Sequence, residues 1–286
     1  MTFRTRFAPS PTGLLHLGHA YSALLSYDMS VAQAGTFLLR IEDTDAARCK
    51  PEFEAAIYED LNWLGVSWPQ PVMRQSDRLQ DYKTTLQILI EAGFCYPCSC
   101  SRGDIRQAIS APQEGTTLDG PLYPGTCRHR SMADWRPGDA VRLNMQAVLK
   151  SRPQIARLEF KETGEIHGAP DGVMHGLSED FLLNGVGDLV LARRIDAAPA
   201  YHLAVVVDDA AQNVTHVVRG ADLFSATKIH IVLQALLKLP TPIYHHHRLI
   251  RDEAGKRLAK RDDARAIRTY RDAGATVQDI RQMVGL

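Results

Sequence analysis

The chain contains 286 residues, of which 45% are hydrophobic, so it can bury the core of one large domain or of two smaller ones. Its 33 basic and 33 acidic side chains balance, so the overall charge does not indicate a nucleic-acid partner. No run of eighteen apolar residues occurs, which excludes a transmembrane helix, and residues 1–4 lack the apolar run of a signal peptide. We therefore expect a cytoplasmic monomer with no membrane partner.

Strand and helix patterns alternate over the first 95 residues. Pro9 and Pro11 break the chain after the first strand, and Gly35 is a favourable C-terminal cap for the first helix. This alternation predicts a parallel α/β sheet. The expected elements are a strand at residues 3–7, a helix at 17–34, a strand at 37–41, a helix at 51–64 and a helix from 76 to 93.

Residues 95–140 differ, because they are rich in Cys, Pro and Gly and have few periodic runs. Such a segment builds little core of its own and needs a tether. Strand and helix patterns then return, and they cover residues 188–194, 201–207, 214–219 and 225–238.

The last part of the chain is basic. Residues 240–286 carry ten Lys/Arg and six Asp/Glu, a net charge of +4, so a mildly basic face there could contact phosphate. We expect a basic loop and two short helices after Pro240. The last helix can begin at Thr276, with Asp279 as its partner in a capping box.

The first chemical signal is His16-Leu17-Gly18-His19, which follows a strand and a Pro-rich turn and opens a helix. A helix N-terminus offers unpaired N–H groups and a positive dipole, both of which favour phosphate. His16 and His19 share one face of the first turn and can donate hydrogen bonds to phosphates as charge develops. Gly18 lets a flat purine lie against the backbone.

The second signal lies far downstream, in Lys256-Arg257-Leu258-Ala259-Lys260-Arg261. A basic run is usually solvated surface, so the segment is weak evidence by itself. A mobile loop whose lysine reaches the triphosphate would stabilise the same transition state from the other side. Paired with the histidine motif in this order, the segment becomes much more specific.

With these residues, the chain resembles the class I glutamyl-tRNA synthetases from about residue 3 to residue 261. The His-x-Gly-His signature matches at all fixed positions, and Arg257–Arg261 matches the basic signature with Ala259 where serine is common. The resemblance implies activation of L-glutamate with ATP and Mg²⁺. It also implies that His16, Gly18, His19 and Lys260 bind ATP, and that His16, His19 and Lys260 are catalytic. Three further segments carry the family pattern: Arg6-Phe7-Ala8-Pro9-Ser10-Pro11-Thr12-Gly13, Arg40-Ile41-Glu42-Asp43-Thr44-Asp45 and Arg219-Gly220-Ala221-Asp222-Leu223.

A glutamate pocket needs a fixed cation for the side-chain carboxylate and an anion for the ammonium. Arg6 and Arg219 lie at strand ends, which converge on one crevice in an open α/β sheet, and arginine binds carboxylate bidentately. Glu42 can take the ammonium, and Tyr201 can form a hydrogen bond. By resemblance these four positions match the family's glutamate-binding residues. The same resemblance places Arg6, Phe7, Ala8, Pro9 and Ser10 along the pocket; we expect Arg40 and Asp45 to form salt bridges only.

Cys98, Cys100 and Cys127 flank the irregular segment, and three thiolates in one loop system suit a structural zinc ion. Spacing alone suggests His129 or Cys95 as the fourth ligand. The family resemblance instead implies Tyr123, four residues before Cys127, and therefore one Zn²⁺ per chain. We expect His245, His246 and His247 to be surface residues, because successive side chains diverge in an extended chain.

Two features resemble the truncated paralogues of the family, which transfer glutamate to queuosine in the anticodon of tRNA(Asp). Only 25 residues follow Arg261, and Val205 stands where tRNA-charging members commonly have Asn. Queuosine carries a cyclopentene diol that can imitate the ribose diol of a terminal adenosine. The expected partner is therefore the queuosine-containing anticodon stem-loop of tRNA(Asp). Two alternatives remain: a minimal synthetase that charges a tRNA 3′ end, and a non-catalytic regulator that binds adenylates or tRNA.

The expected fold is therefore α/β, a Rossmann-like parallel sheet of the class I synthetases with a zinc-binding insertion and a small C-terminal helical segment. Residues 1–95 and 188–240 would form the two halves of the catalytic domain. Residues 96–187 would form an insertion that resembles an acceptor-binding domain. Residues 241–286 would contain the basic signature loop and the short C-terminal helices.

Overall fold

The computed structural model describes residues 2–101, 103–105, 116–117, 120–164, 172–193, 199–250 and 265–286. Its strands are β1 (Arg4–Phe7), β2 (Thr36–Ile41), β3 (Met73–Arg74), β4 (Cys95–Cys98), β5 (Thr116–Thr117), β6 (Gly120–Pro121), β7 (Ala140–Leu143), β8 (Glu159–Glu162), β9 (Val173–Gly176), β10 (Val190–Ala192), β11 (His216–Gly220) and β12 (Ile243–His247). Its α-helices are α1 (Leu17–Ala32), α2 (Pro51–Trp63), α3 (Leu79–Glu91), α5 (Met145–Ser151), α6 (Tyr201–Ala211), α7 (Phe224–Leu237), α8 (Ile267–Asp272) and α9 (Val277–Val284).

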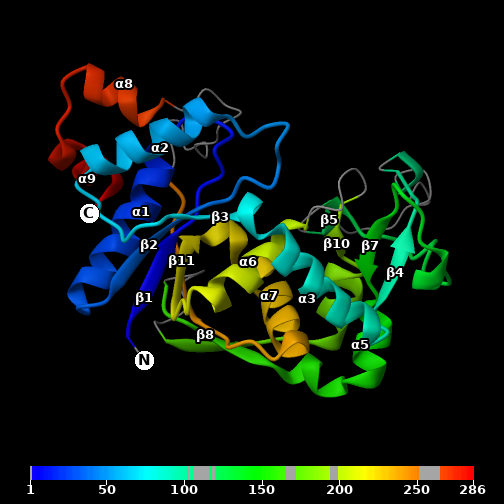
Figure 1. Ribbon diagram of the computed structural model, residues 1–286. Helices are drawn as coiled ribbons and strands as arrows, with labels where there is room; N and C mark the ends of the chain where they lie inside the picture. Colours follow the sequence, from blue (N-terminus) through cyan, green and yellow to red (C-terminus); the bar gives the residue numbers. More distant parts are fainter. Residues whose placement is uncertain are drawn as a thin grey trace.

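Two groups of parallel strands meet at the centre of the molecule (Figure 1). One group contains β1, β2 and β3, and the other contains β11, β12 and β8, with β9 antiparallel at its edge. The groups meet at β1 and β11, where the backbone N–H of Thr215 donates to the carbonyl oxygen of Arg4 at 3.1 Å. The predicted α/β class with a parallel sheet is confirmed.

The helices cover this sheet through apolar faces of the expected spacing. Leu17, Ala20 and Leu24 of α1 are buried against β1 and β2, at positions one and two helical turns apart. In α6 every residue from His202 to Asp209 is buried, as is typical of a helix that is surrounded by protein. It packs against α3 and α7 (Figure 1).

A second, antiparallel sheet in the order β10–β7–β4 lies beside the central one. Its strand β4 opens the Cys-rich part of the chain, and the sheet lies at the end of α3 away from β1 (Figure 1). Because side chains alternate across a strand, Tyr96 and Cys98 of β4 share one face and Cys95 points to the other. Cys98 therefore lies in a small buried cluster that is separate from the larger cores and also contains Tyr96, Tyr123, Cys127 and Ala140.

Two of the strands that the sequence analysis did not expect bear on the predicted domain boundaries. β8 lies inside the segment expected to be an insertion, and β12 follows Pro240, where a loop and helices were expected. β12 pairs with β11 on one side and with β8 on the other, so residues from three of the four expected parts share one sheet. The boundaries proposed at residues 95, 187 and 240 stay a prediction.

Local signals at two helix ends give different outcomes. The capping box at the start of α9 is confirmed, because the hydroxyl of Thr276 accepts from the N–H of Asp279 at 3.2 Å and the Asp279 carboxylate accepts from the N–H of Thr276 at 2.7 Å. At the end of α1 the left-handed residue is Ala34 (φ 47°), not Gly35. A side chain at Gly35 would place its Cβ 2.4 Å from the carbonyl oxygen of Phe3, so glycine is needed there for close packing.

Among the described residues, no helix combines the length and the apolar character needed to cross a membrane.

Candidate active site

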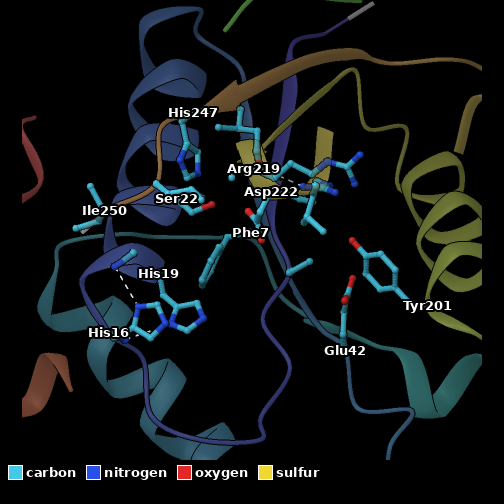
Figure 2. A pocket seen from close by; sticks show the side chains of 17 residues that line it. Phe7, His16, His19, Ser22, Glu42, Tyr201, Arg219, Asp222, His247 and Ile250 are labelled. Atoms are coloured by element: carbon cyan, nitrogen blue, oxygen red, sulfur yellow. Dashed lines mark hydrogen bonds between the residues drawn. The ribbon is translucent and has the colours of Figure 1, made fainter. Parts of the chain in front are cut away.

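A cavity of about 360 Å³ lies where β1, β2, β11 and β12 end and α1 begins (Figure 2). This is the edge at which the carboxyl ends of parallel strands place ligands in α/β folds. Its walls are formed by Arg6, Phe7, Ala8, His16, Gly18, His19, Ser22, Glu42, Tyr201, Val218, Arg219, Gly220, Asp222, Leu223, His247, Leu249 and Ile250.

Most of the residues predicted from the sequence line this one cavity. His16, Gly18 and His19 lie on one side, whereas Glu42 and Tyr201 lie together on another (Figure 2). Arg6, Phe7, Ala8 and Arg219 complete the predicted set in the walls. Pro9 and Ser10 are not wall residues, although the carbonyl oxygen of Pro9 accepts from the N–H of Glu42 at 3.1 Å.

The two histidines close the N-terminus of α1 as a capping box. Nδ1 of His16 accepts from the backbone N–H of Gly18 at 3.1 Å, and Nδ1 of His19 accepts from the backbone N–H of His16 at 3.1 Å. The ring centroids lie 3.8 Å apart, and the ring planes are tilted by 35°. Because a neutral imidazole carries one N–H, each ring that accepts at Nδ1 has its proton on Nε2. Both rings therefore offer an Nε2–H donor for an anion at the helix N-terminus.

Gly18 is required by the histidine beside it. A Cβ at this position would lie 3.0 Å from Cε1 and 3.2 Å from Nδ1 of His16. A side chain here would therefore push the His16 ring away from the N–H group that it caps. This steric reason adds to the expected one, that a glycine lets a flat base approach the backbone.

A buried network of charges connects Arg6 with Glu42. Arg6 donates to both carboxylate oxygens of Asp209, at 3.0 and 3.3 Å. Arg40 donates to Asp209 at 2.7 Å and to Glu42 at 3.1 Å. Burial opposes ionisation of Asp209, but Arg6 and Arg40 lower the pKa of its carboxyl below the usual value. Burial raises the pKa of Glu42 despite Arg40, so an incoming ammonium group would favour its ionised form.

The expectation for Arg40 and Asp45 is confirmed, since both form salt bridges. Arg40 is fully buried among Asp208, Asp209 and Glu42. Asp45 pairs at 2.6 Å with Arg48, near the surface.

The prediction that the three consecutive histidines are surface residues is wrong for two of them. His246 is fully buried and His247 is 7% exposed, so these two are not surface residues. They lie in β12, at the middle of a sheet. His246 contacts Glu162 and Arg219, and His247 lines the cavity with its ring edge-on to Tyr21. The sequence analysis expected a loop here, so it did not anticipate that this segment forms a strand inside the sheet.

Sequence reasoning also missed several other walls of the cavity. Gly220, Asp222 and Leu223 belong to the family segment quoted above, so that segment was the available signal. Ser22, one turn after His19 on α1, could have been found from helical spacing. Val218, Leu249 and Ile250 gave no chemical signal. Lys260 and the whole basic signature at 256–261 lie outside the described residues.

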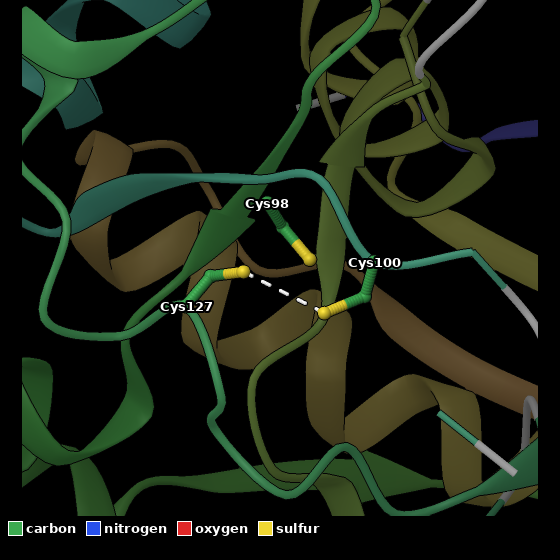
Figure 3. Close-up of side chains that lie close together, drawn as sticks. All are labelled: Cys98, Cys100 and Cys127. Carbon is green, nitrogen blue, oxygen red and sulfur yellow. Dashed lines mark hydrogen bonds between the residues drawn. The ribbon is translucent and has the colours of Figure 1, made fainter. Parts of the chain in front are cut away.

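The three predicted cysteine ligands come together (Figure 3). The sulfur atoms of Cys98, Cys100 and Cys127 all lie within 4.8 Å of one another. The phenol oxygen of Tyr123 lies 3.4 Å from the sulfur of Cys98 and 3.5 Å from that of Cys100. Cys98, Tyr123 and Cys127 are buried. The group found among the described residues contains neither Cys95 nor His129.

A parallel α/β sheet whose cavity pairs a histidine-capped helix with two buried arginines defines a nucleotide-dependent, amino-acid-activating class of enzyme. The family described as class I tRNA synthetases (E and Q), catalytic domain, matches residues 2–286, and the chain belongs to this family.

Comparison with individual proteins shows which members of this family the chain resembles. The chain is 55% identical to the glutamyl-Q tRNA(Asp) synthetase of Rhodobacter capsulatus over 99% of both chains. It is 41% identical to the Geobacter sulfurreducens protein of the same name, over 93% of this chain and 78% of that one. It superimposes on a glutamate tRNA ligase from Elizabethkingia meningosepticum, solved in complex with its amino acid, with a TM-score of 0.69 and 26% identity. That match covers 92% of this chain but only 52% of the ligase, so the chain spans about half of the solved enzyme.

Proposed function

We propose that this protein activates L-glutamate with ATP and transfers it to queuosine in the anticodon of tRNA(Asp). One observation carries the first step. A single cavity holds a histidine-capped helix N-terminus at one wall and two arginines, a carboxyl group and a phenol at the others. The second step is supported by the name of the Rhodobacter capsulatus relative, which matches this chain over 99% of both lengths.

The part of the cavity that contains the two arginines has the charges needed to bind an amino acid with an acidic side chain. Arg6 and Arg219 supply forked donors for carboxylates, and Glu42 supplies the anion for the ammonium group. Tyr201 is 40% exposed, and its ring can close over a bound amino acid and form a hydrogen bond with it. Phe7 and Ala8 supply apolar walls between these polar groups. Pro9 and Ser10 support the turn behind them and stay an expectation as direct contacts.

The histidine wall suits the triphosphate of ATP and its Mg²⁺. One oxygen of the glutamate α-carboxylate attacks the α-phosphorus, and the bond to the bridging oxygen breaks, so that glutamyl-adenylate forms and pyrophosphate leaves. Negative charge grows on the phosphate oxygens during this step. The Nε2–H groups of His16 and His19 are already oriented by their Nδ1 contacts, so they can stabilise this charge without reorganisation. Lys260 is proposed to contribute from the second signature.

Transfer then needs a hydroxyl group. A hydroxyl of the queuosine diol attacks the carbonyl carbon of glutamyl-adenylate, its proton is released, and AMP leaves. An enzyme that acts on tRNA works where tRNA is found, so the cytoplasm remains the expected compartment, and a monomer remains the expected state.

We also propose a structural zinc ion held by Cys98, Cys100, Cys127 and Tyr123. Zn–S bonds of about 2.3 Å in a tetrahedron separate sulfur atoms by roughly 3.8 Å. The three sulfur atoms already lie within 4.8 Å of one another, so a small contraction would complete the site. Burial opposes ionisation of Cys127, but hydrogen bonds from Tyr123 and its neighbours lower the pKa of this thiol to about 6.

Amino-acid-dependent exchange of pyrophosphate into ATP tests the first step. We expect exchange with L-glutamate and little with L-glutamine or L-aspartate. A non-catalytic regulator would bind ATP or tRNA without exchange with any amino acid. Absence of exchange, with and without added tRNA, would therefore reject the proposed activation.

A further inference from the structure

The two arginines of the cavity are held by different kinds of partner. Arg6 forms a forked ion pair with Asp209, so its charge is compensated by a carboxylate. Arg219 is as buried as Arg6, at 5% exposure for each. In the part of the chain that the structure describes, the hydrogen-bond partners of Arg219 are a threonine and two histidines, and no carboxylate lies within salt-bridge distance of it.

These neutral partners surround the guanidinium on two of its edges. On one edge, Nε donates to Nε2 of His246 at 3.2 Å and Nη2 donates to the hydroxyl of Thr227 at 2.5 Å. On another, Nη1 lies 3.3 Å from Nδ1 of His230. The face of Tyr244 lies 5.4 Å from the central carbon. We call Thr227, His230 and His246 the Arg219 cage.

The cage geometry requires both imidazoles to be neutral. A guanidinium can only donate, so Nε2 of His246 and Nδ1 of His230 must both be acceptors. The proton of His246 is then on Nδ1, which lies 2.5 Å from the Glu162 carboxylate. The proton of His230 is on Nε2, which lies 3.1 Å from Nδ1 of His202. Burial lowers the pKa of His246, and burial together with Arg219 holds that of His230 well below its usual value, which agrees with these assignments.

The number of N–H donors on Arg219 shows how many remain for a ligand. A guanidinium has five N–H groups, and the cage uses one on each nitrogen. One N–H remains on Nη1 and one on Nη2, and two terminal N–H groups on one edge of a guanidinium can meet a carboxylate bidentately. Arg219 lines the cavity, so this pair is available to a ligand there.

We propose that Thr227, His246 and His230 are positioning residues that aim the Nη1–Nη2 fork of Arg219 at the side-chain carboxylate of the substrate and leave its positive charge uncompensated. Discrimination of glutamate from glutamine then rests on Arg219, because the charge of Arg6 is already paired. This inference rests on the proposed function, since it assigns the specificity of the same pocket. Glu162 acts one step further out and holds His246 in the required tautomer through its contacts with Nδ1 and with the backbone N–H groups of His246 and Gly164.

Substitution of Thr227 tests the cage with little change in volume. Calorimetry on the full chain should show that T227V binds L-glutamate roughly tenfold or more weakly, because a hydrogen bond to a charged group is lost. Its preference for glutamate over glutamine should fall as well, while ATP affinity stays within about twofold. T227S keeps the hydroxyl and should restore glutamate binding. T85V removes another helical hydroxyl, one that bonds to Asp81 four residues earlier and lies outside the cavity walls, and should behave like the wild type.

The binding results distinguish an error in the Arg219 cage from an error in the proposed function. If T227V is folded and binds glutamate as tightly as the wild type, the cage is wrong and glutamate activation stands. If T227V loses ATP and glutamate binding together and T227S does not restore either, Thr227 is merely structural and the cage is also wrong. If the wild type itself does not prefer glutamate to glutamine, both the cage and the proposed amino acid are wrong.

A measurement that needs no activity supplies a second test. Nitrogen NMR of the wild-type imidazoles at pH 7 should show His246 protonated on Nδ1 alone and His230 on Nε2 alone. H246L and H230L identify the signals by their loss. An imidazolium at either position, or the opposite tautomer, would overturn the cage whatever the variants do in binding assays.

Discussion

Arg6 and Asp209 form a forked ion pair inside the protein, with Nε–Oδ1 and Nη2–Oδ2 distances of 3.0 and 3.3 Å. They come from β1 and from α6, and 202 residues separate them in the chain. Asp209 also accepts from Arg40 at 2.7 Å, so one carboxylate compensates two buried cations. The position of Arg6 at the cavity therefore depends on a residue that does not line it.

Replacement of this carboxylate should be costly. We expect D209N to lower the free energy of unfolding by about 3–5 kcal/mol, because two buried guanidinium groups lose their charged partner. Urea denaturation measures the difference. D28N is the matched control, since Asp28 forms a similar forked pair with Arg281 at 2.7 and 2.9 Å on the surface. It should cost less than about 1 kcal/mol. Equal costs for the two variants would contradict the buried-network account.

The histidine wall should govern the rate of the first step. We expect H16A and H19A each to slow adenylate formation by about 10²–10³, the usual loss for one contact to transition-state charge. Glutamate affinity should change little, because these rings lie on another wall of the cavity. Rapid-quench measurement of glutamyl-adenylate gives the rate. H216A is a control outside the cavity walls, where His216 stacks on Phe3. A normal rate in H16A and H19A would remove both from the mechanism.

The cysteine cluster should bind one zinc ion per chain. Metal analysis should give about one equivalent for the wild type, and C98S or C127S should lose it and loosen the antiparallel sheet that carries β4. Hydrogen exchange of residues 95–98 and 140–143 reports the loosening. C95S is the matched control on the same strand, because Cys95 lies outside the cluster. Zinc-free wild-type protein that is folded and fully active would refute the site.

Asp60 should make stability depend on pH. It is fully buried between α2 and α8, and burial raises the pKa of its carboxyl from 3.8 to about 6, although Arg268 and Arg271 oppose the shift. The folded state therefore binds more protons than the unfolded state between about pH 4 and 6, so stability falls as pH rises through this window. Because water and the neighbouring side chains can relax around the ionised carboxylate, we expect the effect to be about 1–2 kcal/mol.

The D60N variant tests this directly. Above pH 6 it should be more stable than the wild type by that amount, and below pH 4 the difference should vanish. Thermal denaturation across the pH range measures it. E52Q changes an exposed carboxylate on the same helix, one that pairs with Lys50, and should keep the wild-type slope. A D60N variant that is less stable at pH 8 would show that the ion pairs outweigh the burial.

Sequence reasoning succeeded where the signal was local. The capping box at Thr276 joins residues three apart, and the structure forms it. The cysteines were recognised by residue type, because several thiols in one segment suit zinc, and the structure brings them together. Sequence reasoning failed where the partner was distant. His246 is buried because Glu162 and Arg219, 84 and 27 residues away, supply its hydrogen bonds. No periodicity in three consecutive histidines reveals such contacts.

The same distinction applies to the sheet. β1 was predicted because apolar and basic residues alternate before Pro9, and β2 because an apolar run follows Gly35. β8 alternates exposed and buried residues over only four positions, and its place beside β12 depends on the pairing of Glu162 with Tyr244, 82 residues later. No local pattern reveals the role of Asp209, because that role depends on Arg6 and Arg40 from other elements.

The most direct test of the whole account is the site of glutamate transfer. Labelled L-glutamate, ATP and the enzyme should be incubated with tRNA(Asp) that contains queuosine and lacks its 3′-terminal adenosine. We predict that label enters this tRNA, that nuclease mapping finds it on queuosine, and that the same tRNA with guanine in that position stays unlabelled. Periodate treatment should abolish transfer, because it cleaves the cyclopentene diol. Equal labelling of unmodified tRNA(Glu) at its 3′ adenosine, with none on queuosine, would contradict the account and favour a minimal glutamate–tRNA ligase.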